Sequence, residues 1–386
     1  MHRVLILGSG KVGALITTLL AEAGDYRVSV GDRDGEAARA VAEALPGVEA
    51  HALDAASREA LAAHLAAHPV DAVISSLPFH LNPAVAAAAR DAGVHYFDLT
   101  EDLAVTRAVR ELAAGQPQAF VPQCGLAPGF ISIVAHALMS HFEAPGIVKL
   151  RVGALPQHPN NVLKYSLNWS TEGLINEYAN PGQALIDGEL REVQPLEGLE
   201  DIEIDGTRYE AFNTSGGLGS LAETHAGRVE RMDYKTMRYP GHCEQMRLLL
   251  NGLKLRHDRE TLRRILENAV PRTLQDVVVI YASVEGIQQG RLVEENYVNK
   301  VYPQVIGGRL WSAIQLTTAA GVCSVLERVL SQPQTFAGFV PMERFALDEV
   351  LACRFGRLFA HGGSSELSAT LVASGRTRSP APPRED

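Results

Sequence analysis

Hydrophobic and polar positions follow a strand-and-helix pattern up to about residue 125. Short apolar or β-branched runs bounded by turns alternate with Ala-, Leu- and Glu-rich stretches of helical spacing. Such runs are typical of buried parallel strands, so the alternation predicts a Rossmann-type α/β fold with a doubly wound parallel sheet. We expect strands over residues 3–7, 27–30, 48–52, 72–75, 95–98 and 119–121, and helices over 12–23, 34–45, 57–67, 82–91 and 103–113.

After residue 125 the alternation stops. Longer strands are expected over residues 147–152, 162–169, 201–204, 208–212, 228–239 and 275–285, with helices over 242–250 and 260–269. Several of these strands alternate polar with apolar residues, which is typical of a sheet with one exposed face. This region predicts a mixed α/β substrate domain with a largely antiparallel sheet. A helical pattern returns over 312–330, where Ala319, Ala320 and Gly321 are small enough for close packing against the first domain.

These patterns divide the chain into domains. Residues 1–125 and about 312–373 would form a discontinuous dinucleotide-binding domain, and 126–311 the domain for substrate binding and dimerisation. The Pro- and Arg-rich segment 374–386 would be a loose tail. A chain of 386 residues, 46% of them hydrophobic, is long enough for two cores. The long, partly apolar second sheet leads us to expect a homodimer.

Composition and charge exclude several classes of function. The formal net charge of −10 argues against nucleic acid or an anionic membrane as the main partner. The longest apolar stretch, 126–139, is interrupted by Pro128, Ser132 and His136, so no membrane span is expected. The four cysteines stand far apart, without a CxxC pair, and therefore indicate reduced thiols in a cytoplasmic protein without a metal site.

The strongest motif is the segment Gly8-Ser9-Gly10-Lys11-Val12-Gly13. It follows an expected strand and opens an expected helix, as a dinucleotide fingerprint requires. Gly8 would allow the tight turn, Gly10 would let the pyrophosphate approach the backbone, and Gly13 would let the helix pack on the strand. The phosphates would then lie at the helix N-terminus, where free N–H groups favour negative charge.

Residues at the ends of later strands fit the same cofactor. Asp32, 24 positions after Gly8, could accept hydrogen bonds from ribose hydroxyls, which favours NAD, whereas the adjacent Arg33 could accommodate the 2′-phosphate of NADP. Asp54 could reach the adenine or cap the next helix. The segment Ser75-Ser76-Leu77-Pro78 would let a dinucleotide approach closely, or would form a plain turn.

Several segments together resemble the saccharopine dehydrogenase family. They are Gly8 to Gly13, Val73-Ile74-Ser75-Ser76-Leu77-Pro78, Cys124-Gly125-Leu126-Ala127-Pro128-Gly129, Val152-Gly153-Ala154-Leu155-Pro156 and Tyr165-Ser166-Leu167-Asn168-Trp169-Ser170. Glu210 to Gly217 and the segment from Lys235 to His242 look like the bacterial lysine 6-dehydrogenase branch. The resemblance covers about residues 1–350. It implies a Rossmann domain, a mixed α/β substrate domain, and nicotinamide-dependent oxidation at a C–N bond.

Two positions depart from the family pattern. Ala127 stands where the family usually has an acid, and Ser166 stands where saccharopine reductases usually have a lysine. Both changes put saccharopine, which carries three carboxylates, in doubt as the substrate. They fit a smaller substrate such as lysine or a related diamine or amino acid.

Amine oxidation needs a proton acceptor, and four residues are candidates. His242 follows Pro240-Gly241 at the expected start of a helix, where its pKa would be lowered, or it merely caps that helix. Lys235 is a candidate for the catalytic site or for anion binding. Asp98 ends a strand and could bind the substrate ammonium or cap the next helix. Glu172 could also hold an ammonium group.

Other residues are candidates for binding. Arg238 could grip a carboxylate with its guanidinium fork, or pair with neighbouring acids on a strand. Tyr165, Trp169 and Tyr239 are candidates for the wall of the substrate pocket, although Trp169 could equally be core. Cys124 and Gly125 would lie near the nicotinamide, with Cys124 as an apolar filler. The loop 213–217 could bind an anion through backbone N–H groups or form an ordinary turn.

The sequence therefore predicts an NAD(P)-dependent oxidoreductase that acts on saccharopine, lysine or a related amine. One alternative is a lysine 6-dehydrogenase proper, or a polyamine reductase of the carboxynorspermidine type. Another is a dinucleotide-binding protein without catalysis.

Overall fold

The computed structural model describes residues 1–360, so the expected tail at 374–386 lies outside the described residues. Seven strands form a parallel sheet in the order β17-β6-β5-β4-β1-β2-β3. They are β1 (His2–Leu7), β2 (Tyr26–Asp32), β3 (Glu49–Ala52), β4 (Ala72–Ser75), β5 (His95–Asp98), β6 (Ala119–Val121) and β17 (Gly338–Phe339). This order reverses beside β1, as in a doubly wound dinucleotide-binding sheet.

A second sheet has the order β10-β11-β12-β7-β13-β14, with β8 pairing β12 and β9. Only β12 and β7 pair in parallel among these neighbours. Its strands are β7 (Ala144–Pro156), β8 (Gly182–Ile186), β9 (Glu189–Val193), β10 (Glu200–Ile204), β11 (Thr207–Asn213), β12 (Arg231–Arg238), β13 (Asp276–Gln288) and β14 (Arg291–Val301). A short hairpin joins β15 (Gln304–Ile306) to β16 (Arg309–Trp311). The predicted fold class, a parallel Rossmann sheet with a mixed and mostly antiparallel second sheet, is confirmed.

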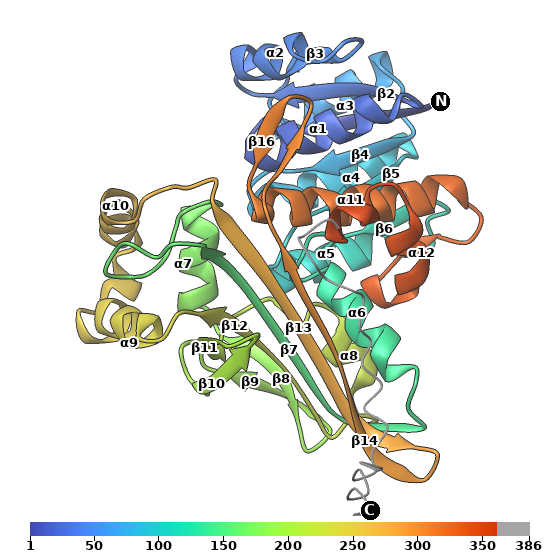
Figure 1. Cartoon of the computed structure of the whole chain (residues 1–386). Coiled ribbons are helices and arrows are strands. Elements are labelled where there is room, and N and C mark those ends of the chain that lie inside the picture. Colours follow the sequence, from blue (N-terminus) through green and yellow to red (C-terminus); the bar gives the residue numbers. More distant parts are fainter. Residues whose placement is uncertain (361–386) are drawn as a thin grey trace, which may run out of the picture.

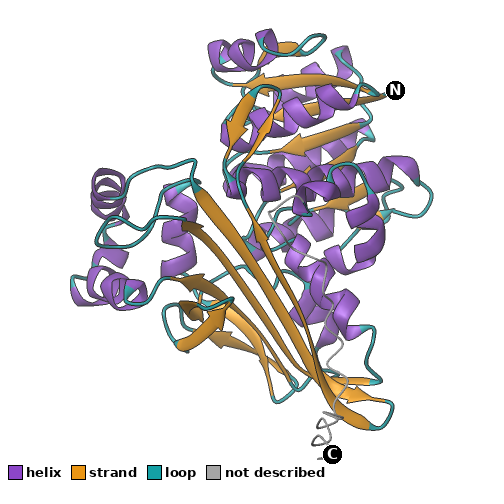
Figure 2. Cartoon of the chain, in the orientation of Figure 1, coloured by secondary structure: helices purple, strands orange, loops and turns teal. Residues whose placement is uncertain are grey.

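Helices cover both faces of the parallel sheet and join it to the second sheet (Figures 1 and 2). Their bounds are α1 (Lys11–Ala23), α2 (Gly35–Glu43), α3 (Arg58–Ala67), α4 (Asn82–Ala92), α5 (Leu103–Leu112), α6 (Phe130–Met139), α7 (Thr171–Ala179), α8 (Leu221–His225), α9 (His242–Arg247), α10 (Arg259–Ala269), α11 (Ala313–Ser331) and α12 (Leu347–Ala352).

The core is more continuous than two separate cores would be. One cluster of buried residues runs from Ile6 and Ile74 in the parallel sheet, through α6 and α11, to Val148 and Ile280 in the second sheet. Helix α11 packs closely at Gly321, because a Cβ there would lie 2.5 Å from the carbonyl oxygen of Gly125. The expected close approach of the far-end helix therefore rests on a small residue.

Most of the predicted elements form, several further short elements were not predicted, and three of the departures have clear physical reasons. No strand forms over 162–169, because the Asn161 side chain binds the backbone of Tyr165 and Lys164 adopts a φ of 49°, which together make a turn. The apolar run at 130–139 is helix α6, which an apolar run alone cannot distinguish from a buried strand. Strand β14 was not expected, since its polar and apolar residues alternate only weakly.

Helix α11 is long and apolar enough, by length and composition alone, to cross a membrane. No membrane-spanning segment was predicted from the sequence. In the structure 78% of that stretch is buried inside the protein, where it contacts α1 and β13. It thus has the environment of a core helix.

Candidate functional site

The glycine-rich turn between β1 and α1 has the geometry of a phosphate-binding loop. Gly8 has a φ of 101°, and a Cβ at Gly13 would lie 1.9 Å from the carbonyl oxygen of Gly8. Gly10, which caps α1, is different, because a Cβ there would meet no heavy atom within 4 Å. The loop therefore leaves open space in front of the helix N-terminus, which fits a pyrophosphate.

Asp32 ends β2 and holds this loop. Its Oδ2 accepts hydrogen bonds of 2.8 Å from both the N–H and the hydroxyl of Ser9, and its Oδ1 accepts one of 3.0 Å from Asp34 N–H. Burial alone would raise the pKa of Asp32, but these hydrogen bonds outweigh it and lower the pKa. The carboxylate is therefore ionised beside the loop, and the exposed Arg33 follows it.

The other expected cofactor residues line the same edge of the sheet. A Cβ at Gly8 would lie 2.7 Å from the carbonyl oxygen of Ser76 and 3.3 Å from Leu77, so the segment ending at Pro78 crosses next to the glycine turn. Ser75 is buried and its hydroxyl donates to Asn82 at 2.7 Å. Asp54 is exposed and accepts from Ala56 N–H, while Ser57 caps α3, so the alternative of Asp54 as helix cap is wrong.

Asp98, at the end of β5, is fully buried and does not cap α5, because Asp102 does. Its Oδ1 accepts from the N–H groups of Thr100 and Gln123, and its Oδ2 accepts from the hydroxyl of Tyr96 at 2.7 Å. Burial raises the pKa of Asp98 to about 6, against these hydrogen bonds. The carboxyl thus fixes the two turns that follow β5 and β6.

Two acidic residues that were not predicted from the sequence lie close together where the two sheets join. Glu101 follows β5 and Glu177 lies on α7. Burial raises the pKa of Glu177 to about 7, and it also raises the pKa of Glu101, with the charge of Glu177 as its second cause. The Nη2 of Arg238 lies 3.6 Å from Oε2 of Glu177. That oxygen is buried and has no hydrogen-bond partner among the described residues.

Arg238 is held by the protein rather than presented as a free fork. Its Nε donates to the hydroxyl of Tyr178 at 2.8 Å, and its Nη1 donates to Thr236 Oγ1 and to the carbonyl oxygen of Met237. The guanidinium also stands 4.8 Å from the ring centroid of Tyr165. Only the side toward Glu177 remains for another group, so the geometry assigns Arg238 to positioning that carboxyl.

His242 is the first residue of α9, and Gly241 is the cap. The imidazole is buried between the carbonyl oxygen of Leu163, 2.7 Å from Nδ1, and the hydroxyl of Tyr178, 3.0 Å from Nε2. Burial and the nearby Arg238 lower the pKa of His242 to about 3. The pKa is thus lowered as expected, although by burial and Arg238 rather than by the helix start. Both ring nitrogens are already engaged, which argues against His242 as the proton acceptor.

Lys235 lies on the opposite face of β12 from Thr236 and Arg238, since successive strand residues alternate. Its Nζ pairs with Glu200 at 2.6 Å, and Glu200 also binds the buried Arg151 at 2.5 Å. Arg151 in turn pairs with Asp233. This network is self-contained, and it separates Lys235 from the Glu101–Glu177 pair.

The expected substrate residues divide into two groups. Tyr165 is buried beside Arg238, and its hydroxyl accepts from the half-buried Trp169 at 2.8 Å. Tyr239 instead stacks on Tyr209 and donates to the carbonyl oxygen of Pro156, in a cluster on the other face of the sheet. Glu172 is exposed and lies 3.9 Å from Arg259, so it does not join the acid pair.

The remaining candidates have packing roles. Cys124 is buried and its thiol donates to the carbonyl oxygen of Val121. Burial raises the pKa of this thiol, which fits the predicted role of an apolar filler. The loop 213–217 is a poor anion site, since Gly216 packs on Glu101 and Gly217 on the ring of Tyr234. Positive charge lies elsewhere: burial and the nearby Arg272 lower the pKa of Lys11, whose Nζ is 3.5 Å from the carbonyl oxygen of Asn168.

Two family models match the chain over nearly its whole length. The saccharopine dehydrogenase NADP binding domain matches residues 4–121, and the saccharopine dehydrogenase C-terminal domain matches residues 125–362. With the loop geometry above, this shows that the cofactor is a nicotinamide dinucleotide.

Individual relatives are distant. The saccharopine dehydrogenase (NADP(+), L-glutamate-forming) of Saccharomyces cerevisiae is 30% identical over 269 residues, which are 66% of this chain and 59% of that protein. The mitochondrial alpha-aminoadipic semialdehyde synthase of Rattus norvegicus is 25% identical over 229 residues, 54% of this chain and 23% of that protein. The chain therefore spans less than two thirds of either relative.

Among solved structures, the apo saccharopine dehydrogenase (L-Glu forming) from Saccharomyces cerevisiae has a similar fold. The TM-score is 0.74 at 20% identity, and the match covers 91% of this chain and 96% of that one. At this identity the match establishes the fold alone.

Proposed function

This chain is an oxidoreductase of the saccharopine dehydrogenase family, and we propose that it transfers hydride between a nicotinamide dinucleotide and the amine-bearing carbon of a lysine-type amino acid. The observation that supports this most is the partly buried pair of Glu101 and Glu177, next to Arg238, near the carboxyl ends of the Rossmann strands. Titratable groups with strongly shifted pKa values at such an edge are typical of catalytic sites.

In this proposal the ionised carboxylate of Glu177 accepts a proton from the substrate ammonium. The C–H bond on the adjacent carbon then breaks, its electron pair leaves as hydride, and the nitrogen lone pair forms the C=N bond. When bound, the dinucleotide supplies the hydride acceptor. Water adds to the C=N bond and the C–N bond breaks, which gives an aldehyde and the free amine or ammonia. Arg238 positions Glu177 throughout.

We propose lysine, or a related diamine or amino acid, ahead of saccharopine. The ionised carboxylate of Glu177 at the junction of the sheets favours a cationic amine over a substrate with three carboxylates. The departures at Ala127 and Ser166 point the same way. Lys11 and Arg272 offer positive charge near the phosphate loop for the substrate carboxylate or for the pyrophosphate.

For the cofactor we propose NAD ahead of NADP. The ionised carboxylate of Asp32 would accept hydrogen bonds from ribose hydroxyls and repel a 2′-phosphate. Arg33 is the residue through which NADP would bind instead. We also propose a cytoplasmic homodimer and retain the predicted domain boundaries.

The proposal is tested by offering the purified chain lysine, saccharopine and related diamines with NAD or NADP, and by following absorbance of the reduced nicotinamide. Turnover of lysine or a diamine above that of saccharopine is expected. Reduction of an imine formed from a carboxylated polyamine, faster than any oxidation, would instead indicate a polyamine reductase. Tight dinucleotide binding without turnover of any of these compounds would contradict an enzymatic role on amines.

A further inference from the structure

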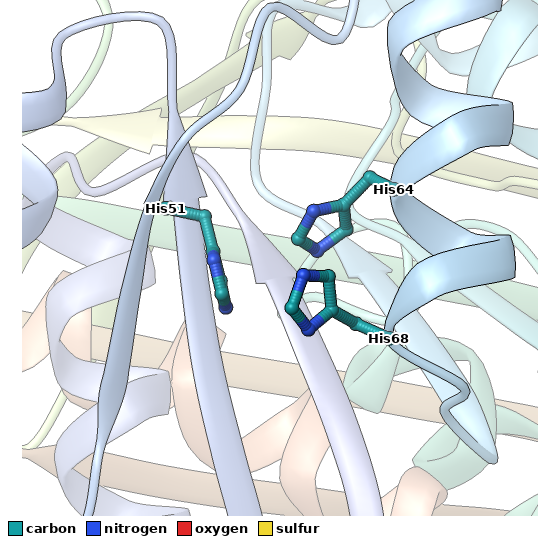
Figure 3. A group of neighbouring side chains, drawn as sticks. All are labelled: His51, His64 and His68. Atoms are coloured by element: carbon teal, nitrogen blue, oxygen red, sulfur yellow. The ribbon is translucent and has the colours of Figure 1, made fainter.

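Three histidines lie together at the far edge of the parallel sheet, away from the acid pair. His51 comes from the edge strand β3, and His64 and His68 come from the last turn of α3 and its C-terminal cap (Figure 3). Their ring centroids form a nearly equilateral triangle, with separations of 4.6, 4.7 and 4.8 Å. Positions i and i+4 place His64 and His68 on one face of the helix.

Two ring nitrogens of the cluster lack hydrogen-bond partners. The Nε2 atoms of His51 and His64 are buried and have no hydrogen-bond partner within the described part of the chain. An unsatisfied buried nitrogen destabilises a fold. The fold nevertheless places the His51 and His64 rings, each with one such nitrogen, beside each other and beside the ring of His68. One shared ligand could bind a nitrogen of all three rings.

We propose that His51, His64 and His68 form a binding site for a zinc-class transition-metal ion. One nitrogen from each ring lies within 4.8 Å of the other two. In a tetrahedral site with Zn–N bonds of about 2.0–2.1 Å, the nitrogens stand about 3.3 Å apart and the ring centroids about 5 Å apart. The ring centroids already stand close to this spacing, so reorientation of the imidazoles would bring the nitrogens together.

The ligand type favours this ion. Imidazole nitrogens suit zinc, copper or nickel, whereas calcium and magnesium prefer oxygen ligands.

The fourth position would be open to water or to Glu49, whose Oε2 lies 3.9 Å from His51 Nε2. Strand β3 lies four strands away from β5, the strand that precedes Glu101. At the usual strand spacing this separates the histidine cluster from Glu101 by about 19 Å. The ion would therefore not touch the reacting atoms. It would tie α3 to the edge strand β3, and the inference does not depend on the proposed reaction.

Zinc binding to the untagged, chelator-treated full chain tests the proposal. Calorimetric titration should give one equivalent of Zn²⁺ per chain, and Co²⁺ should give the intense visible absorption of a tetrahedral site. His64→Gln and His68→Ala should each weaken Zn²⁺ binding by about a hundredfold or more, since even outer-shell partners contribute about 10- to 100-fold. His158→Ala, which removes an exposed histidine elsewhere, should bind as the wild type does.

Thermal unfolding separates binding from misfolding. Zn²⁺ should raise the Tm of the wild type and of His158→Ala, but not that of His68→Ala. His68 is exposed, so its variant should have the wild-type Tm without metal and keeps the test valid if His64→Gln fails to fold. Absence of saturable binding in the wild type, or equal affinity in His68→Ala, would overturn the proposal.

Discussion

Glu177 and Arg238 lie 3.6 Å apart in the interior, yet the pKa of the carboxyl is raised to about 7 rather than lowered. Burial is the larger cause and the guanidinium only offsets part of it. Arg238 is otherwise occupied by Tyr178, Thr236 and a backbone carbonyl, so it cannot form a close bidentate pair. A carboxyl in this state can gain and lose a proton near neutral pH, as a general base must.

Glu177→Gln should therefore abolish most of the turnover. Loss of a general base typically lowers kcat by about 10²- to 10⁴-fold. Dinucleotide affinity should remain within about twofold, because the substitution lies outside the glycine loop. Steady-state kinetics with the best amine substrate, alongside a fluorescence titration of the reduced dinucleotide, provide both measurements.

Glu172→Gln is the matched control on the same helix. Glu172 is exposed and only weakly paired with Arg259 at 3.9 Å, so its loss should leave kcat near the wild-type value. If Glu172→Gln were the inactive variant and Glu177→Gln the active one, the assignment of the base would be reversed.

The pH dependence of amine oxidation should follow Glu177. The base must be ionised to accept a proton, so kcat/KM should rise with pH through about 7 and then level off. The reverse, reductive reaction needs the protonated form and should slow over the same range. Initial rates in both directions across pH test this, and a profile without a limb near 7 would exclude Glu177 as the titrating group.

Two glycines in the phosphate loop should behave differently. Gly13→Ala would place a Cβ 1.9 Å from the carbonyl oxygen of Gly8, so it should lower both stability and dinucleotide affinity. Gly10→Ala meets open space, and should keep the wild-type Tm while weakening dinucleotide binding, because its methyl group occupies the pyrophosphate position. Thermal unfolding and equilibrium binding distinguish the two, and unimpaired binding by Gly10→Ala would move the cofactor elsewhere.

Asp98 should make stability depend on pH. Its pKa is about 6 in the fold against about 4 when unfolded, so the native state binds more protons between these values. Its contribution is then complete below about pH 4 and is lost as the pH rises to about 6. The free energy of unfolding of the wild type minus that of Asp98→Asn should decline over this range.

The two substitutions at Asp98 should also differ in severity. Asn keeps an oxygen for the N–H groups of Thr100 and Gln123. Asp98→Ala leaves both donors unpaired in the interior, and should destabilise the protein by about 2–4 kcal/mol. Denaturant unfolding at neutral pH gives both values, and equal stability of the Ala and Asn variants would show that these hydrogen bonds contribute little.

Cofactor preference should depend on Asp32. Asp32→Ser removes the carboxylate that disfavours a 2′-phosphate, so the ratio of the Kd for NADP to the Kd for NAD should fall by about tenfold, or about 1.4 kcal/mol. Arg33→Ala should weaken NADP alone. Competition binding measures both ratios. A wild type that prefers NADP and is insensitive to Asp32→Ser would contradict the assignment of NAD.

The fold was largely predictable because local patterns specify it. The strand before Gly8, the small residues of the turn and the acid at Asp32 are close in sequence, and each has one structural meaning in that context. The turn at Asn161 was missed because a side-chain bond to Tyr165 overrides an apolar run that favours a strand.

The candidate site was less predictable, because its chemistry arises from tertiary burial. Nothing near Glu177 in the sequence distinguishes it from the exposed Glu172, and only tertiary burial, which the nearby Arg238 partly offsets, raises its pKa. Lys235 and Arg238 are close in sequence, which suggests a shared site. Strand alternation places them on opposite faces, where Lys235 pairs with Glu200.

The central claim is that hydride passes between the dinucleotide and an amine-bearing carbon of the substrate. The most direct test uses lysine that carries deuterium on the carbon next to the side-chain nitrogen. The chain oxidises this lysine, and mass spectrometry then measures the deuterium in the reduced dinucleotide. The account predicts one deuterium transferred per turnover by the wild type, and little reduced dinucleotide from Glu177→Gln. Reduced dinucleotide without deuterium, or none from this or any related amine, would contradict it.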